Sequence, residues 1–265
     1  VSIDNPLYTA ADFTFTGNAT VKGTDAGSYD MELKAADFTN TNKNFSNVEF
    51  VIVDGTLEIS KRTVTLTSAD DEKVYYGTAL TNSNVTVGGD GFAEGEGAAY
   101  DVTGTQTEVG SSANAFTYTL NSNTKADNYT ITKTEGTLTV TELTDKVTVT
   151  ITENSGSEKY DGSEKTVTGY TVSIDNELYT EADFTFSGKA EAKRTNVVEG
   201  EDADGQTDMG LAASQFVNNN PNFATVTFNV TDGYQKITPI NVTVKIVGKN
   251  SSVPYDGEDH TVTGY

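Results

Sequence analysis

The chain has 265 residues, with 39 acidic against 17 basic side chains and a formal net charge of −22 at pH 7. A surface this negative repels phosphate backbones and anionic lipid headgroups, so we expect neither nucleic-acid binding nor membrane insertion. The chain contains no cysteine, which excludes disulfides, zinc–thiolate sites and thiol nucleophiles.

Period-two alternation of β-branched residues predicts half-buried strands along the chain. Its clearest instances are TVTLT (63–67), VTVTI (147–151), VTFNV (226–230) and VTVKI (242–246). Asp-Gly pairs at 54–55, 90–91, 161–162, 232–233 and 256–257 predict turns. Short helical turns are predicted at 33–38 and 211–216. The predicted fold class is therefore all-β, with small β-sandwich or β-grasp-like domains whose antiparallel sheets have one solvated face.

Internal repetition is the strongest signal in the sequence. Residues 1–17 (VSIDNPLYTAADFTFTG) match 172–188 (VSIDNELYTEADFTFSG) at 14 of 17 positions. The match continues between 31–55 and 209–233 through recurring apolar positions: Met31/Met209, Leu33/Leu211, Phe38/Phe216, Phe45/Phe223, Val48/Val226 and Phe50/Phe228. The second copy is longer within RTNVVEGEDADG (194–205), and an insertion tolerated there predicts a surface loop.

Short motifs resemble the tandem β modules of bacterial cell-surface proteins known as YDG and MBG-type domains. They are KYDGSEKTVTGY (159–170), PYDGEDHTVTGY (254–265), KVYYGTAL (73–80) and DGTLEI (54–59). Tyr76 stands where the other copies have aspartate, which leaves the subtype of the middle unit open. The resemblance implies extracellular, wall-attached proteins of adhesin type that are built as long stalks and carry no catalytic residues.

The repeats and the resemblance together predict four segments. Residues 1–62 are the C-terminal part of a YDG-type unit without its first strands, 63–142 are an MBG-like unit, and 143–240 are a complete YDG-type unit. Residues 241–265 align without a gap to 146–170 and form the first strands of a further YDG-type unit. We expect these domains to be strung end to end as a rod, each contacting mainly its neighbours.

The two ends of the sequence are in phase, because 241–265 followed by 1–62 makes one whole unit with a single residue missing. Three interpretations remain open. The chain is one period of a longer repetitive protein; or its last strands complete the first domain of a neighbouring copy, head to tail; or the boundary is accidental. No signal peptide or sorting signal is visible, so we expect a segment of a longer protein.

The acidic stretch EGEDADGQTD (199–208) is the candidate metal site. Asp202, Asp204 and Asp208 surround Gly205 and could hold Ca²⁺, although the ligand spacing of an EF-hand loop is not met. The alternative is a solvated hairpin tip. His260 is the single histidine, so a serine–histidine–acid triad would have to use it; its place is taken by Lys165 in the other copy, which argues against catalysis.

The repeated Tyr160-Asp161-Gly162 is interpreted as structural, with glycine allowing a turn, aspartate capping it and tyrosine packing on the sheet. We expect no enzyme activity and no cofactor. The leading functional hypothesis is a structural stalk or fibre of a bacterial surface adhesin, attached to the cell wall through a part outside this segment. The alternative is weak, multivalent binding of host glycan or mucin by the modules themselves.

Overall fold

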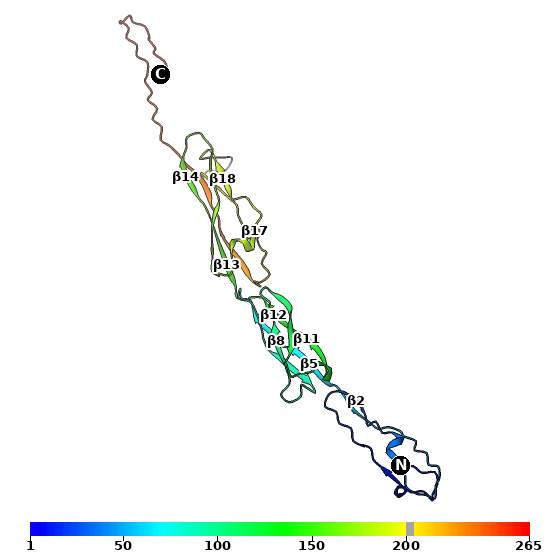
Figure 1. Cartoon of the computed structure of the whole chain (residues 1–265). Helices are drawn as coiled ribbons and strands as arrows, with labels where there is room; N and C mark the ends of the chain where they lie inside the picture. Colours follow the sequence, from blue (N-terminus) through cyan, green and yellow to red (C-terminus); the bar gives the residue numbers. More distant parts are fainter. Residues whose placement is uncertain (200–203) are drawn as a thin grey trace. The chain divides into compact units, whose positions relative to one another are not determined.

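The computed structural model describes residues 1–199 and 204–265 (Figure 1). Within that part of the chain the regular structure is strands and short 3-10 turns, which confirms the predicted all-β class. The chain divides into two compact units, Val1–Glu142 and Leu143–Tyr265. Each unit is described by itself below, beginning with the second.

In the described residues of the second unit, 143–199 and 204–265, there are ten strands in four small sheets. The strands are β13 (Val147–Glu153), β14 (Gly156–Lys159), β15 (Lys165–Thr168), β16 (Tyr170–Ile174), β17 (Phe184–Phe186), β18 (Glu191–Arg194), β19 (Gln206–Asp208), β20 (Phe216–Asn218), β21 (Val226–Thr231) and β22 (Tyr234–Thr238). The sheet orders are β16-β13-β21, β14-β22-β19, β15-β18 and β17-β20. Two 3-10 turns, η4 (Glu181–Asp183) and η5 (Ala213–Gln215), complete it.

Strand β13 is the central strand of its sheet. Its alternation places Val147, Val149 and Ile151 on one fully buried face, as the sequence predicts. It pairs antiparallel with β16 and parallel with β21. The sheet is therefore mixed and not antiparallel throughout, because strands from the two ends of the repeat lie side by side and point the same way.

The same parallel arrangement continues into the next sheet. Strand β14, which follows β13, pairs parallel with β22, which follows β21. The β13–β14 and β21–β22 segments therefore cross side by side from the first sheet to the second. Gly233 lies at this crossing, where a Cβ atom would meet the Asn154 carbonyl oxygen at 2.2 Å. The Asp232-Gly233 pair thus marks a crossover between sheets, and glycine is required there by the close approach of two backbones.

An aromatic cluster fills the interior beside β13. Phe216 stacks on Phe228 with ring centroids 5.6 Å apart and on Phe186 at 4.8 Å. Tyr179 meets Phe223 edge to face at 5.0 Å. Each large aromatic side chain removes more surface from water than an aliphatic one, so these rings add substantially to the aliphatic core of the repeat.

Polar side chains fix the turn next to this cluster. The Tyr179 hydroxyl lies 3.0 Å from Asn218 Oδ1, and the Asn220 amide donates to Asp183 Oδ1 at 2.8 Å. Burial, followed by the charge of Asp183, raises the pKa of Tyr179 to about 12, which keeps its hydroxyl neutral. The asparagine-rich loop after η5 is therefore held by specific hydrogen bonds, and the predicted helical turn at 211–216 is confirmed as a 3-10 turn.

The first unit contains twelve strands in five small sheets. The strands are β1 (Phe13–Phe15), β2 (Gly27–Asp30), β3 (Phe38–Asn40), β4 (Thr56–Ile59), β5 (Arg62–Ser68), β6 (Asp71–Val74), β7 (Val85–Gly89), β8 (Ala98–Val102), β9 (Gly110–Asn114), β10 (Phe116–Leu120), β11 (Tyr129–Thr134) and β12 (Gly136–Thr141). The sheet orders are β1-β3, β2-β4, β11-β5-β7, β6-β12-β9 and β10-β8. Its 3-10 turns are η1 (Ala10–Asp12), η2 (Ala35–Asp37) and η3 (Ala126–Asn128).

Residues 63–142 repeat the parallel plan of the second unit with a different core. Strand β5 pairs parallel with β11, and β6 pairs parallel with β12. Val64, Leu66, Phe116 and Tyr129 form the buried cluster. Ser68 stands at the crossing between sheets, where its hydroxyl accepts the Gly136 N–H at 2.9 Å. Residues 63–142 and 143–240 therefore share one strand-pairing plan.

Residues 1–62 reproduce the polar and aromatic contacts of the second unit. The Tyr8 hydroxyl lies 3.1 Å from Asn40 Oδ1, and the Asn42 amide donates to Asp12 Oδ1 at 2.9 Å. The Tyr8 and Phe45 rings meet edge to face at 5.1 Å. Asp25 links this segment to η3, where the side chains of Lys125 and Asn128 donate to its carboxylate.

Residues 241–265 carry no assigned strand (Figure 1). The alternating segment 242–246, a predicted strand, is an extended stretch in which Val242, Val244 and Ile246 are 76%, 74% and 66% exposed. A strand needs a neighbour to satisfy its backbone donors and acceptors, and no sheet of the described chain pairs with this stretch. The strand prediction at 242–246 is therefore wrong for the chain as the structure shows it.

Candidate functional site

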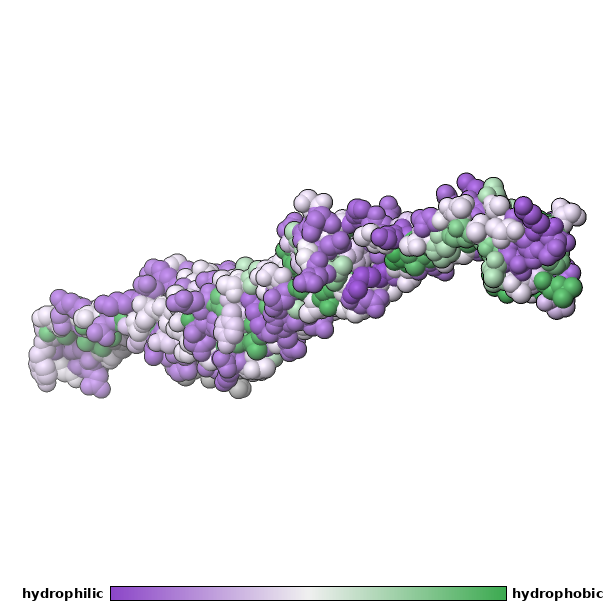
Figure 2. All heavy atoms as spheres, turned by 60° about the horizontal axis from the view of Figure 1, so that its bottom comes forward, coloured by the Kyte–Doolittle hydropathy of each residue, from purple (hydrophilic) through white to green (hydrophobic). Residues whose placement is uncertain are grey.

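An open groove of about 650 Å³ runs along the first repeat between residues 1–5 and 47–52. Its floor is the aromatic cluster, with Tyr8, Phe13, Phe38, Phe45 and Phe50 facing it. Figure 2 shows apolar side chains of this segment at the surface. Tyr8 is buried and the other four rings are half-buried, so the groove is a partly covered apolar surface.

The groove occupies the place that β13 fills in the second unit. Its walls, residues 1–3 and 48–52, align with 172–174 and 226–230, which are the two neighbours of β13. The aromatic floor has the same geometry in both units: Phe38 and Phe50 lie 5.6 Å apart, as do Phe216 and Phe228. The difference is burial, because Phe216 is 4% exposed whereas Phe38 is only half-buried.

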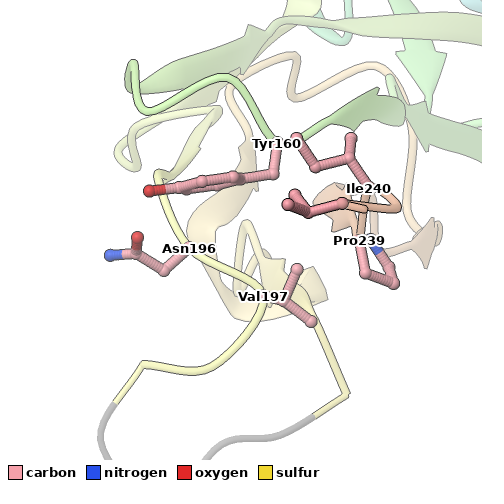
Figure 3. Close-up of a pocket in the computed structure, with 6 residues that line it drawn as sticks. Tyr160, Asn196, Val197, Pro239 and Ile240 are labelled. Carbon is pink, nitrogen blue, oxygen red and sulfur yellow. The ribbon is translucent and has the colours of Figure 1, made fainter. Parts of the chain in front are cut away.

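A second groove, of about 400 Å³, lies beside the Tyr-Asp-Gly turn (Figure 3). Tyr160 lies along it together with Asn196, Val197, Pro239 and Ile240. The Tyr160 ring is 38% exposed. The expected packing of this tyrosine on the sheet is thus incomplete, since the Tyr160 ring borders an open groove.

The remaining residues of the motif act as a turn, as the sequence predicts. Asp161 Oδ1 accepts the Ser163 N–H at 2.9 Å, and Asp161 Oδ2 accepts the Lys165 ammonium at 2.6 Å. These hydrogen bonds, led by that of Lys165, hold the pKa of Asp161 well below its usual range. Gly162 has a φ of +81°, which favours glycine.

The acidic candidate site is only partly described. Asp202 lies outside the described residues. Asp204 Oδ1 accepts the Gln206 N–H at 2.9 Å, and Asp208 Oδ1 accepts the Gln206 side-chain amide at 2.7 Å. Within 1–199 and 204–265, no three histidine, cysteine, aspartate or glutamate side chains gather as a metal-binding group. The calcium site therefore stays a prediction.

The single histidine lies in the extended C-terminal segment. Its Nε2 lies 2.9 Å from Asp256 Oδ1 and both side chains are exposed. The same turn in the second unit joins Lys165 to Asp161, so His260 takes the position of a lysine that closes a turn. In both copies a side-chain nitrogen four residues after the turn aspartate lies within hydrogen-bond distance of its carboxylate.

Glu153 is a buried carboxyl that the sequence analysis did not single out. It is 5% exposed at the end of β13, where one oxygen accepts the Gly233 N–H at 2.8 Å and the other has no hydrogen-bond partner. Burial and the neighbouring Asp232 raise its pKa to about 7. The sequence does indicate that Glu153 is buried, because Glu153 follows Ile151 by two residues and continues the inward-facing alternation of Val147, Val149 and Ile151.

Comparisons with protein-family models, curated proteins and solved structures give no match for this chain. The resemblance to YDG and MBG-type domains therefore stays a prediction based on the four short motifs. In the described part of the chain, no helix has the length and apolarity needed to span a membrane. The geometry of the repeats is thus the basis for the functional proposals below.

Proposed function

We propose that the chain is a non-enzymatic structural repeat segment, part of a stalk or fibre that a bacterial surface protein of adhesin type extends outside the cell. The observation that carries the proposal is the parallel pairing of the first and last strands within single repeats. Strand β13 pairs with β21 and β14 with β22; β5 pairs with β11 and β6 with β12.

Parallel end strands determine how a repeat responds to a pulling force. A force on the two ends of residues 143–240 draws β13 backward and β22 forward along their common axis. The cross-strand hydrogen bonds are then loaded together in shear, whereas strands pulled from the same end separate one bond at a time. Strands loaded in shear lower the rate at which the repeat unfolds under force. That rate determines how long a stalk under tension stays folded.

Single-molecule pulling of the whole chain by its two ends tests the proposal. We expect two high-force unfolding events, one for residues 63–142 and one for 143–240. The matched control pulls the same repeat from another pair of points. Because the chain has no natural cysteine, the double variant Lys146→Cys/Ala224→Cys allows pulling handles to be attached at these two positions alone. Both positions lie at the same end of the β13–β21 pair. That geometry peels the strands apart, and we expect a several-fold lower force. Equal forces in the two geometries would contradict a load-bearing role.

A second candidate function rests on the Tyr160 groove. An exposed aromatic ring beside the Asn196 amide is a combination that can stack on a sugar ring and hydrogen-bond its hydroxyls. Weak binding of host glycan or mucin at repeated grooves would gain strength by multivalency.

A glycan array probed with the whole chain distinguishes this function from the stalk alone. If the groove binds sugar, the chain gives a signal that Tyr160→Ala reduces at least tenfold. Tyr255→Ala serves as the matched control, because Tyr255 is the equivalent residue in the extended segment and lies outside the groove. A signal that both variants preserve would place the sugar elsewhere, and no signal at all would leave the stalk as the function.

A further inference from the structure

We propose that residues 23–27 form a latch that docks on the Lys-X-X-Asn turn at 125–128 and holds the repeats 1–62 and 63–142 together as one rigid body. The inference goes beyond the proposed stalk, because a rigid joint is a property of these two repeats whether or not they bear load. It rests on contacts inside the first compact unit, Val1–Glu142.

The Asn128 side chain makes two hydrogen bonds to the neighbouring repeat at once. Its Nδ2 donates to Asp25 Oδ1 at 2.9 Å, and its Oδ1 accepts the Ala26 N–H at 2.8 Å. All three residues are half-buried. A carboxamide that donates and accepts side by side fixes the orientation of its partner as well as the distance, because both bonds are directional.

Lys125 adds charge attraction to the same carboxylate. Its Nζ lies 2.7 Å from Asp25 Oδ2, and the two side chains are 66% and 42% exposed. The hydrogen bond from Lys125, followed by that from Asn128, holds the pKa of Asp25 below its ordinary value. An ion pair this exposed contributes little by itself, whereas hydrogen bonds sheltered from water contribute more. The main holding role therefore belongs to Asn128, and Lys125 assists it.

The loop is shaped for this contact by its own residues. The Tyr29 hydroxyl donates to the Asp25 carbonyl oxygen at 2.8 Å. The Tyr29 ring lies over Gly23, where a Cβ atom would come within 2.4 Å of Tyr29 Cε2. A loop that is already held in its docked form loses less conformational entropy on docking, so the contact across the joint is stronger.

The second copy of this repeat has a different loop interior. Gly23 and Tyr29 align with Arg194 and Thr207. Arg194 is 2% exposed and donates to Thr207 Oγ1 at 3.1 Å, so an arginine takes the place that the tyrosine ring has in the first copy. The Gly23–Tyr29 contact is therefore particular to the first copy, whose shorter loop is the one that reaches the next repeat.

The latch lies beside the covalent connection between the two repeats. Strand β2 begins directly after it, where Gly27 pairs with Ile59, and β11 begins directly after the 125–128 turn, where Tyr129 pairs with Arg62. Only residues 60–61 lie between β4 and β5. A link of two residues by itself has soft backbone dihedrals about which the repeats can rotate, and a second attachment beside the link opposes that rotation.

The distribution of distances between the two repeats tests the proposal. Because the chain has no natural cysteine, Thr14→Cys/Thr117→Cys places spin labels on exposed positions of β1 and β10 alone. Double electron–electron resonance on this labelled chain measures the distribution. We expect a narrow distribution that stays narrow at about 1 M salt, where charges are screened beyond about 3 Å but the Asn128 hydrogen bonds persist. A broad distribution at low salt would overturn the proposal.

Asn128→Asp is the variant that opens the latch. It keeps an oxygen for the Ala26 N–H but replaces the donor that faces Asp25 by a second carboxylate oxygen, so we expect the distribution to become at least twofold wider. Asn18→Asp is the matched control, because it makes the same change at an exposed asparagine outside the latch and keeps an acceptor for the Thr20 N–H. Its distribution is expected to match that of the unchanged chain, and equal widening by the two variants would contradict the latch.

Exchanging the two side chains separates a latch from a local structural role of Asn128. In Asp25→Asn/Asn128→Asp the carboxamide and the carboxylate change places, so the hydrogen bond between them and the acceptor for the Ala26 N–H are both retained. We expect the narrow distribution to return, with hydrogen-exchange protection of β5 and β11 equal to that of the unchanged chain. If the exchanged chain stays as wide as Asn128→Asp, or if its β5 and β11 lose protection, Asn128 acts within its own repeat and the proposal is wrong.

Discussion

Replacing Phe216 by alanine is expected to destabilise the repeat of residues 143–240 by about 3–5 kcal/mol, the range for removing a buried phenylalanine. Phe216 is 4% exposed and contacts the rings of Tyr170, Phe186 and Phe228. Alanine leaves a cavity in the middle of this aromatic cluster. Because single domains are stable by only about 5–15 kcal/mol, most of the stability of this repeat would be lost.

The equivalent change in the first repeat is expected to cost less. Phe38 keeps its contacts with Phe13, Phe15 and Phe50 but is only half-buried, because its side toward the groove is open. Phe38→Ala should therefore lower the stability of residues 1–62 by roughly 1–2 kcal/mol, since less apolar surface returns to water. Because Phe38 and Phe216 occupy equivalent positions in nearly the same sequence, the two substitutions differ mainly in how deeply the replaced ring is buried.

Hydrogen–deuterium exchange read by mass spectrometry measures the two effects separately, because one transition temperature is not meaningful for a chain with several repeats. Each substitution is made singly in the otherwise unchanged chain. We expect protection of β13 and β21 to fall far more in Phe216→Ala than protection of β1 and β3 falls in Phe38→Ala. Equal losses would mean that the groove does not leave the first cluster uncovered.

Period-two patterning predicted single strands well where a buried face decides the structure. The stretches 63–67 and 147–151 became β5 and β13 with their alternate valines, leucine and isoleucine inside. The aligned phenylalanines likewise formed matching clusters. Local sequence suffices for such features because the side-chain period alone selects the inward face.

Period-two patterning could not predict which strands pair with one another. Alternation is the same whether a neighbour runs parallel or antiparallel, so the β13–β21 pair was not predicted. The stretch 242–246 shows the further limit, since it has nearly the pattern of 147–151 but lies without a partner. A strand depends on a neighbour that its own residues do not encode.

The buried acid at the end of β13 leads to a pH dependence of opposite sign to that of most carboxylates. Burial is the largest cause that raises the pKa of Glu153 to about 7; the Gly233 N–H opposes it, and the neighbouring Asp232 adds to it. The unfolded chain has an ordinary glutamate pKa near 4.5. Between these values the folded repeat binds more protons than the unfolded chain, so its stability falls as the pH rises from about 4.5 to 7.

The expected loss across that window is roughly 3 kcal/mol, from 1.36 kcal/mol for each unit of difference between the two pKa values. Glu153→Gln removes the titration and keeps an oxygen for the Gly233 N–H and an amide to donate to Asp232. We therefore expect equal stability of the two chains near pH 5 and a more stable Glu153→Gln chain at pH 8. Comparing the chains at each pH cancels the titration of every shared group.

Asp232→Asn is the complementary control, because it removes the negative charge beside Glu153 and leaves a side-chain oxygen for the Gly210 N–H that Asp232 accepts at 3.0 Å. It should lower the pKa of Glu153 and reduce the loss of stability between pH 5 and 8 without abolishing it. Exchange protection of β13 and β21, followed at pH 5, 6, 7 and 8, measures all three chains. If wild type and Glu153→Gln keep a constant difference over this range, Glu153 is charged in the folded repeat throughout. The carboxyl would then have to be solvated at the crossing between the two sheets, instead of buried there beside Asp232.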